Sequence, residues 1–312
     1  CCMYRRFLWF HLRNYRLVAL SVCCILLSHL LVIVMDKCIL THAVLERTVN
    51  VSDNDRYIEL LRRNGFVLVE SGLSSAEIAR ARTVVDEIYL SQAKDVGGEE
   101  LLDLINDKNI ARAVCAYDDL MLQIATLPAI MNLADEYLRQ AFVLSSQNGI
   151  INPPSDPHYQ CSWHRDLNYQ HYTSSRPLAL SVLLALDPFN ANTGGTYVLP
   201  GSHLFETFPS DEYVIENQKV ITCDEGTLIF FDPMMFHRTG FNYSKNTRRA
   251  VNHIINAALL NQAYDFKRIF KSKGVEISDS KLAKYIFGYG SAWSIESWRN
   301  KKIEQYNSTK TL

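Results

Sequence analysis

The stretch GTLIFFDPMMFHRTGFN, residues 226–242, joins a glycine, a short apolar run and a histidine. Gly226 precedes the apolar run at residues 228–231, and His237 follows that run. Short apolar runs bounded by turn residues are typical of buried β-strands. The stretch therefore predicts a core strand that ends beside a polar segment able to carry chemistry.

Other β-rich runs lie around this stretch, and turn residues separate them. They are AFVLSSQNGIIN (141–152), LALSVLLALD (178–187), GTYVLPGSH (195–203), KVITC (219–223) and RRAVNHIINA (248–257). Many short strands with turn residues between them are typical of a sandwich or barrel. We therefore expect an antiparallel jelly roll in the second half of the chain.

The first half of the body has helical periodicity instead. Amphipathic patterns predict helices at about 53–63, from 75 onward, at 99–116 and at 127–139. Ser74 and Glu77 have the spacing of a capping box, and Thr126 and Pro128 suit the start of the last helix. Helices first and an antiparallel sheet later predict an α+β fold with helices packed outside the jelly roll.

Composition excludes some classes of protein. The chain has 312 residues and a formal net charge of -1, so it lacks the basic excess of a nucleic-acid binder. The body contains Cys115, Cys161 and Cys223 without CxxC spacing, which argues against a disulfide framework or a zinc ribbon. These features favour a reduced, intracellular type of protein.

A second motif can complete a metal site with His237. In CSWHRDLNYQ, residues 161–170, strand alternation places His164 and Asp166 on one side and Arg165 on the other. Two histidines and one carboxylate form the facial triad that binds Fe(II) in non-haem oxygenases and leaves coordination positions open. The H-x-D motif alone is common by chance, so an ordinary polar strand end is the alternative interpretation. Arg248, on a later β-run, has the guanidinium fork that binds a carboxylate.

Five ordered segments resemble one known family. They are WHRD (163–166), ALSVLLALD (179–187), GGTYVLPGSH (194–203), GTLIFFDPMMFHRTGFN (226–242) and TRRAVN (247–252). Over residues 57–298 the sequence is similar to the phytanoyl-CoA dioxygenase family, which includes ectoine hydroxylase. Its members are Fe(II)- and 2-oxoglutarate-dependent oxygenases with a double-stranded β-helix core of the cupin-like type.

The resemblance implies specific roles. It implies that His164, Asp166 and His237 bind Fe(II) and that O₂ and 2-oxoglutarate are cosubstrates, with ascorbate as a reductant. It implies that 2-oxoglutarate contacts Arg248, Thr239, Asn152 and Asn148. The intact Asp166 favours hydroxylation, because halogenating relatives have a small residue there.

The substrate is less well defined by the sequence. We expect five residues to face its pocket: Tyr169, His171, Tyr172, Arg176 and Arg238. The predicted reaction is hydroxylation of an unactivated C–H bond in a small-molecule or acyl-type substrate, with release of succinate and CO₂. The alternative hypothesis is a catalytically silent β-helix domain that senses a metal or ligand. The sequence predicts no oligomeric state.

The N-terminus has two main interpretations. Residues 17–35 are apolar and uncharged, which suits a single membrane-spanning helix, and four arginines precede them. Alternatively Met35 is the native start, and residues 1–34 are a non-native extension. We therefore divide the chain into an anchor or extension (1–40), a dioxygenase domain (50–305) and a tail (306–312). The predicted location is intracellular with a membrane tether, or cytoplasmic if Met35 is the start.

Overall fold

The computed structural model describes residues 52–156, 159–167, 173–289 and 295–310. The chain divides into two compact units, residues 1–52 and 53–312, and every element named below belongs to the second. The predicted span at residues 17–35 and the candidate start Met35 lie outside the described residues. Within the described ranges, no helix has both the length and the apolar character needed to cross a bilayer.

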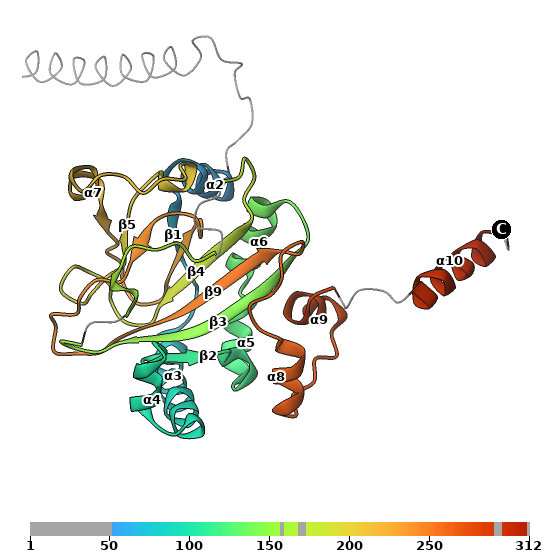
Figure 1. Ribbon diagram of the computed structural model, residues 1–312, viewed down its shortest axis with the longest axis horizontal. Coiled ribbons are helices and arrows are strands. Elements are labelled where there is room, and N and C mark those ends of the chain that lie inside the picture. Colours follow the sequence, from blue (N-terminus) through green and yellow to red (C-terminus); the bar gives the residue numbers. More distant parts are fainter. Residues whose placement is uncertain (1–51, 157–158, 168–172, 290–294, 311–312) are drawn as a thin grey trace, which may run out of the picture. The chain divides into compact units, whose positions relative to one another are not determined.

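Two antiparallel sheets form the centre of this unit (Figure 1). The large sheet has the order β1 (Phe66–Glu70), β7 (Thr227–Phe231), β4 (Ala179–Ala185), β9 (Arg248–Ala257), β3 (Phe142–Asn152) and β2 (Ile110–Arg112). The small sheet has the order β6 (Lys219–Val220), β5 (Tyr197–Val198) and β8 (His237–Arg238). An isolated bridge between His164 and His237 adds a further backbone segment beside β8.

Helices precede, interrupt and follow the strands. They are α2 (Asp53–Asn64), α3 (Ser75–Val96), α4 (Glu99–Leu104), α5 (Asp119–Ala125), α6 (Pro128–Leu138), α7 (Asp211–Asn217), α8 (Phe266–Ser272), α9 (Ser280–Phe287) and α10 (Ile295–Lys310). Three 3₁₀ turns are η1 (Val114–Ala116), η2 (Tyr159–Cys161) and η3 (Ser202–Leu204). The predicted tail is therefore helical as far as residue 310.

The continuous apolar runs of the sequence are explained by burial of both faces of the large sheet. In β4, Leu180, Val182 and Leu184 join the core formed with α3, α5, α6, α8 and α9. The alternate residues Leu183 and Ala185 join the core shared with the small sheet. Because successive strand residues point to opposite faces, a strand between two layers is mostly apolar on both faces. The predicted mixture of helices and antiparallel sheet is confirmed.

The capping box before α3 is confirmed by its hydrogen bonds. Glu77 N donates to Ser74 Oγ at 3.3 Å, and Ser74 N donates to Glu77 Oε2 at 2.8 Å. Thr126 is not the cap of the following helix, because its hydroxyl donates to Leu122 O at 3.1 Å and thus belongs to the end of α5. α6 instead begins at Pro128 with Leu127 as its N-cap.

The predicted helix at 99–116 is confirmed from Glu99 to Leu104 and is wrong after that. α4 ends at Leu104, and Asn106 and Asn109 then adopt left-handed backbone angles, with φ of 56° and 66°. Asparagine tolerates this region better than most residues, and it ends helical propagation. The following residues form β2, whose pairing with β3 outweighs the local helical preference.

His253 lies in the core between β4 and β3 and leads to a prediction on acid stability. Its side chain is fully buried, with Nδ1 3.1 Å from Val182 O and Nε2 2.9 Å from the Gln147 amide. Burial lowers the pKa of His253 to about 4. In the unfolded chain His253 has the ordinary histidine pKa of about 6.5 and is protonated below that pH. The folded protein binds this proton only near pH 4, so the free energy of unfolding is highest above about pH 6.5 and decreases as the pH falls toward 4.

We expect this histidine to remove about 3 kcal/mol of stability between pH 7 and pH 4. Urea unfolding of the wild type and of His253→Gln at pH 7.5 and 4.5 measures the effect. The wild type should lose more stability than the variant. Equal losses in both proteins would contradict the assignment of a neutral, buried His253.

Candidate metal centre

Three side chains from two distant segments meet at one point. His164 and Asp166 follow η2, and His237 opens β8. Each offers a ligand atom, and these atoms lie within 4.8 Å of one another. Asp166 Oδ1 is 3.3 Å from His237 Nε2 and 4.0 Å from His164 Nε2.

Backbone hydrogen bonds hold the two segments together. His164 N donates to His237 O at 3.0 Å, and His237 N donates back to His164 O at 3.1 Å. Asp166 N donates to Pro233 O at 2.9 Å. Each candidate ligand is therefore attached to the other segment through the main chain next to it, which limits how far the three side chains can separate.

Further contacts orient each ligand atom. His164 Nδ1 lies 2.8 Å from Ser162 O, and His237 Nδ1 lies 2.9 Å from Met235 O. A ring nitrogen that donates to a carbonyl leaves Nε2 as the unprotonated one, so both Nε2 lone pairs are available to a metal. Ser181 Oγ donates to Asp166 Oδ2 at 2.7 Å, which leaves Oδ1 on the side of the imidazoles.

The electrostatics of the cluster suit a cation. Although burial opposes ionisation, His237, His164 and the Ser181 hydroxyl lower the pKa of Asp166 to about 2. Burial and the neighbouring His237 lower the pKa of His164. Burial also disfavours the charged form of His237, but Asp166 outweighs it and raises the pKa of this imidazole. A metal would therefore meet an ionised carboxylate between the two imidazoles, and its binding would compete with protonation of His237.

Ser181 offers a test of this arrangement. Ser181→Ala removes the hydroxyl that holds Asp166 Oδ2, and we expect metal affinity to fall about 10- to 100-fold, the usual effect of losing such a partner. Equilibrium dialysis against Co(II) measures the affinity. Thermal unfolding of the metal-free proteins separates this effect from misfolding. Wild-type affinity in a folded variant would show that Ser181 does not orient the carboxylate.

A narrow cavity extends from this cluster between the two sheets. Its eleven lining residues are Ile150, Gln160, His164, Asp166, Leu183, Thr196, Phe231, His237, Thr239, Arg248 and Asn252. Arg248 is 2% exposed, and its Nη2 donates to Gly194 O at 2.7 Å. Arg248 Nε has no hydrogen-bond partner in the described part of the chain. Burial lowers the pKa of Arg248 to about 10, so it stays charged at neutral pH without a contacting carboxylate.

Gly194 has a backbone angle that few other residues adopt. Its φ is 74°, and an added Cβ would lie 2.5 Å from both Asn152 Nδ2 and Gly240 O. Glycine is therefore required where the chain passes close to β8 and presents the carbonyl that accepts from Arg248.

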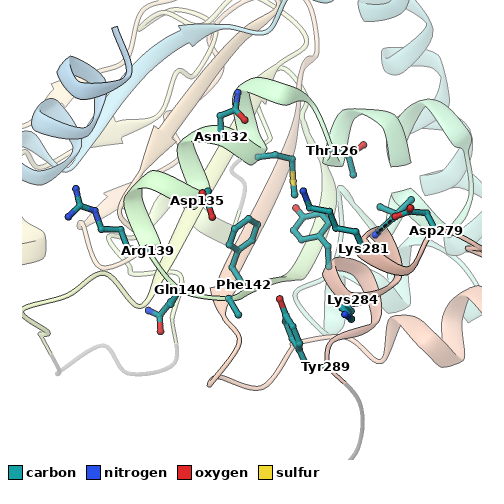
Figure 2. Close-up of a pocket in the computed structure, with 14 residues that line it drawn as sticks. Thr126, Asn132, Asp135, Arg139, Gln140, Phe142, Asp279, Lys281, Lys284 and Tyr289 are labelled. Atoms are coloured by element: carbon teal, nitrogen blue, oxygen red, sulfur yellow. Dashed lines mark hydrogen bonds between the residues drawn. The ribbon is translucent and has the colours of Figure 1, made fainter. Parts of the chain in front are cut away.

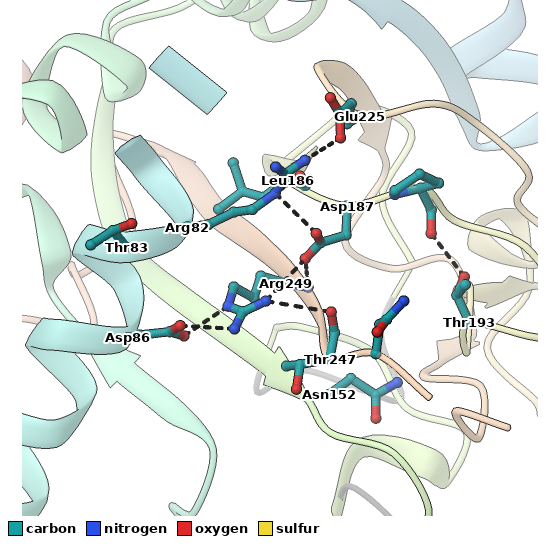
Figure 3. A network of polar contacts seen from close by, with 12 residues as sticks. Arg82, Thr83, Asp86, Asn152, Leu186, Asp187, Thr193, Glu225, Thr247 and Arg249 are labelled. Carbon is teal, nitrogen blue, oxygen red and sulfur yellow. Dashed lines mark hydrogen bonds and ion pairs between the residues drawn. The ribbon is translucent and has the colours of Figure 1, made fainter. Parts of the chain in front are cut away.

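Arg249, the next residue, points toward Asp86 on α3 (Figure 3). Its guanidinium donates to both oxygens of Asp86 on α3 at 2.8 Å, and its backbone N donates to Asp187 Oδ2 at 2.7 Å. Asp187 also pairs with Arg82 at 2.9 Å. This network attaches β9 to α3, and strand alternation then directs Arg248 into the cavity.

Arg165, the middle residue of the H-x-D motif, is the most extensively bonded arginine near the site. Its side chain is 2% exposed, and its Nε donates to Met234 O at 2.6 Å. Its other nitrogens donate to the carbonyls of Ser202, Phe205 and Glu206. Arg165 thus joins the motif to the segment before His237 and to the loop that contains η3.

The structure places the other predicted site residues as follows. Thr239 lines the cavity. Asn152 is outside the lining but pairs with Arg248 across the strands, and its Oδ1 has no partner among the described residues. Asn148 is also outside the lining, and its Oδ1 accepts from the Tyr264 hydroxyl at 2.8 Å.

The described residues among those predicted for the substrate pocket do not share one cavity. Arg238 lies over the rings of Tyr197 and Trp163, at 4.1 and 5.2 Å from their centroids, and it does not line the metal cavity. Arg176 lies three residues before β4 and lines a different cavity from the metal cavity. Tyr169, His171 and Tyr172 lie outside the described residues.

Sequence reasoning missed several polar residues of the site. Gln160, Thr196 and Asn252 line the cavity, and Ser181 binds the carboxylate. For Ser181 a signal exists, because it is a polar residue inside the otherwise apolar strand β4. Asn252 gives no such signal, because β9 contains several other polar residues. Gln160 lies in a short 3₁₀ turn and gives no such signal.

A jelly roll that combines two histidines and one aspartate with a buried arginine at the same cavity has the architecture of an iron- and 2-oxoglutarate-dependent oxygenase. The sequence profile of the phytanoyl-CoA dioxygenase (PhyH) family matches residues 61–250. The chain belongs to this family.

Individual proteins of known sequence or structure are similar to this chain. An uncharacterised protein of Mycobacterium bovis is 29% identical over 226 residues, which cover 70% of this chain and 81% of that protein. Human peroxisomal phytanoyl-CoA dioxygenase is 24% identical over 221 residues, which cover 61% of this chain and 64% of the human enzyme. Among solved structures, EctD from S. alaskensis with 2-oxoglutarate and 5-hydroxyectoine has a TM-score of 0.56 at 20% identity, covering 69% of this chain and 79% of EctD.

Proposed function

We propose that this protein hydroxylates an unactivated C–H bond of a small-molecule or acyl-type substrate, with conversion of 2-oxoglutarate to succinate and CO₂. The observation that carries the proposal is the cavity with three convergent ligand atoms and a buried arginine whose Nε has no partner in the described chain. A buried charge without a carboxylate is costly, so a cavity that keeps one fits an anionic cosubstrate.

The residues present fit both groups. His164, Asp166 and His237 would hold Fe(II), since two neutral imidazoles and one carboxylate leave coordination positions open. Arg248 would bind the distal carboxylate of 2-oxoglutarate, with Thr239 beside it. When bound, iron and 2-oxoglutarate supply the oxidative chemistry, in which O₂ is consumed and a hydroxyl group is delivered to the substrate.

The protein's own part is to bind, orient and exclude water. Backbone bonds to Ser162 and Met235 orient the imidazoles, and the Ser181 hydroxyl orients the carboxylate. Apolar walls from Ile150, Leu183 and Phe231 keep bulk water from the cavity, which strengthens the electrostatic contacts inside it.

The direct test is turnover of 2-oxoglutarate. The purified chain with Fe(II), ascorbate and 2-oxoglutarate should release succinate slowly, and candidate C–H donors should raise that rate with formation of one hydroxylated product per succinate. A silent sensor domain would bind metal and 2-oxoglutarate but release no succinate with any donor. Metal-dependent 2-oxoglutarate binding without turnover would therefore favour the sensor hypothesis.

A further inference from the structure

A second cavity, distinct from the metal site, gathers positive charge. Its volume is about 530 Å³, and no residue of its lining is shared with the metal cavity. Its walls come from the end of α2, the end of α6, the segment before β4, the turn η3 and the segment after β7. Leu167, Ala179 and Met234 form a small apolar cluster. Met234 also lines this second cavity, and Leu167 directly follows Asp166 in the sequence.

Three arginines line this second cavity: Arg62, Arg139 and Arg176. Within the described residues, none of their guanidinium groups has an ion pair or a hydrogen bond. The whole chain is nearly neutral, with 32 basic and 33 acidic residues, so this is a local concentration of cations. Three uncompensated guanidinium groups around one cavity repel one another, and an anion between them removes that repulsion.

A neighbouring cavity shows the contrast (Figure 2). It shares Arg139 and Gln140 with the arginine-lined cavity, but it also contains Asp135 and Asp279 beside Lys281 and Lys284. Figure 2 shows Arg139 pointing away from the two lysines. The charges of that neighbouring cavity are therefore largely balanced, whereas those of the arginine-lined cavity are not.

The one carboxylate of the arginine-lined cavity is already engaged. Asp232 Oδ2 accepts from the Tyr137 hydroxyl at 2.7 Å, and Asp232 Oδ1 accepts from Met234 N at 2.8 Å. Its side chain is buried, and burial raises the pKa of Asp232. Asp232 therefore does not pair with the arginines of this cavity, because both of its oxygens already accept hydrogen bonds within the protein.

We propose that the arginine-lined cavity is a binding site for a phosphate-bearing small molecule, held by Arg62, Arg139 and Arg176. Each guanidinium presents a fork of N–H donors, and three forks need more acceptor oxygens than one carboxylate has. A phosphate group offers three terminal oxygens and a charge near −2, which matches the arginines in number and sign. The hydroxyls of Ser174 and Ser175 and the amide of Gln140 line the same space and add neutral donors.

The test uses inorganic pyrophosphate as the probe and titrates it calorimetrically into the metal-free full chain at constant ionic strength. Saturable binding is expected. Each of Arg62→Gln, Arg139→Gln and Arg176→Gln should weaken it about tenfold, the effect of one charge-assisted hydrogen bond. These arginines are exposed, so the substitutions should leave the fold intact, which thermal unfolding checks.

Arg63→Gln is the matched control. Arg63 is the neighbour of Arg62 on α2, is 75% exposed and pairs with Glu59 at 2.9 Å outside the cavity. It should leave pyrophosphate affinity within about twofold of the wild type, since Arg63 does not line the cavity and its charge is already paired with Glu59. Acetate should bind far more weakly than pyrophosphate.

Three results would overturn the proposal: no saturable binding, equal weakening by Arg63→Gln, or loss of binding in the variant Arg248→Met, whose substitution lies in the metal cavity. The last result would place pyrophosphate in the metal cavity instead. None of these measurements needs iron or turnover, so the test is independent of the proposed oxygenase activity.

Discussion

Replacing His237 with alanine should lower metal affinity by more than about 100-fold and reduce succinate release by about three orders of magnitude. His237 is one of three candidate ligands, and its Nε2 lies 3.3 Å from Asp166 Oδ1. Without it, one imidazole and one carboxylate remain, which is too few ligands to hold Fe(II) firmly against water. Equilibrium dialysis with Co(II) and the visible absorption spectrum of the bound Co(II) measure metal binding, and the succinate assay measures activity.

His253→Gln is the control for this experiment. His253 is also buried in the sheet region but does not line the metal cavity. The control should keep wild-type metal affinity, although its stability changes. If His237→Ala binds Co(II) as tightly as the wild type and gives the same spectrum, the three side chains do not form the metal centre.

Replacing Arg248 with methionine should raise the KM for 2-oxoglutarate by about 100-fold or more while changing kcat much less. Losing one partner of a buried charge pair costs about 2–5 kcal/mol, and every 1.4 kcal/mol is a factor of ten. The free protein should change little in stability, because the variant loses the bond to Gly194 O and the contact with the Phe189 ring but also removes a desolvated charge. Initial rates of succinate release at varied 2-oxoglutarate measure the effect.

The adjacent arginine provides the comparison. Arg249→Met removes the two bonds to Asp86, so it should lower the unfolding temperature and leave the KM for 2-oxoglutarate nearly unchanged. Thermal unfolding adds a second readout for Arg248→Met, since 2-oxoglutarate with a redox-inert metal should stabilise the wild type but not this variant. An unchanged KM in Arg248→Met would remove this residue from the cosubstrate site.

The sequence was sufficient wherever the signal is local. The Ser74–Glu77 capping box forms as predicted, because its geometry depends on four consecutive residues. The strands at 179–185 and 227–231 were predictable from apolar runs. Both faces of these strands are buried, so apolar residues do not alternate with polar ones. The three ligand candidates and Arg248 were predictable from residue type and family-like spacing, and the structure brings His164, Asp166 and His237 within reach of one metal ion.

Only the tertiary structure determined which segment became a strand and which polar residues line the cavity. The segment after α4 has a helical pattern, but pairing of β2 with β3 makes it a strand. Asn148 and Asn252 face each other across β3 and β9, yet only Asn252 lines the cavity, because Tyr264 binds Asn148.

The same holds for the charged residues. Arg62, Arg139 and Arg176 are far apart in sequence, and only the packing of α2, α6 and the segment before β4 brings them to one cavity. Residue chemistry and local periodicity can be identified from short stretches of sequence. Which polar groups share a cavity depends on strand register and on contacts between distant segments, and the folded chain alone sets these.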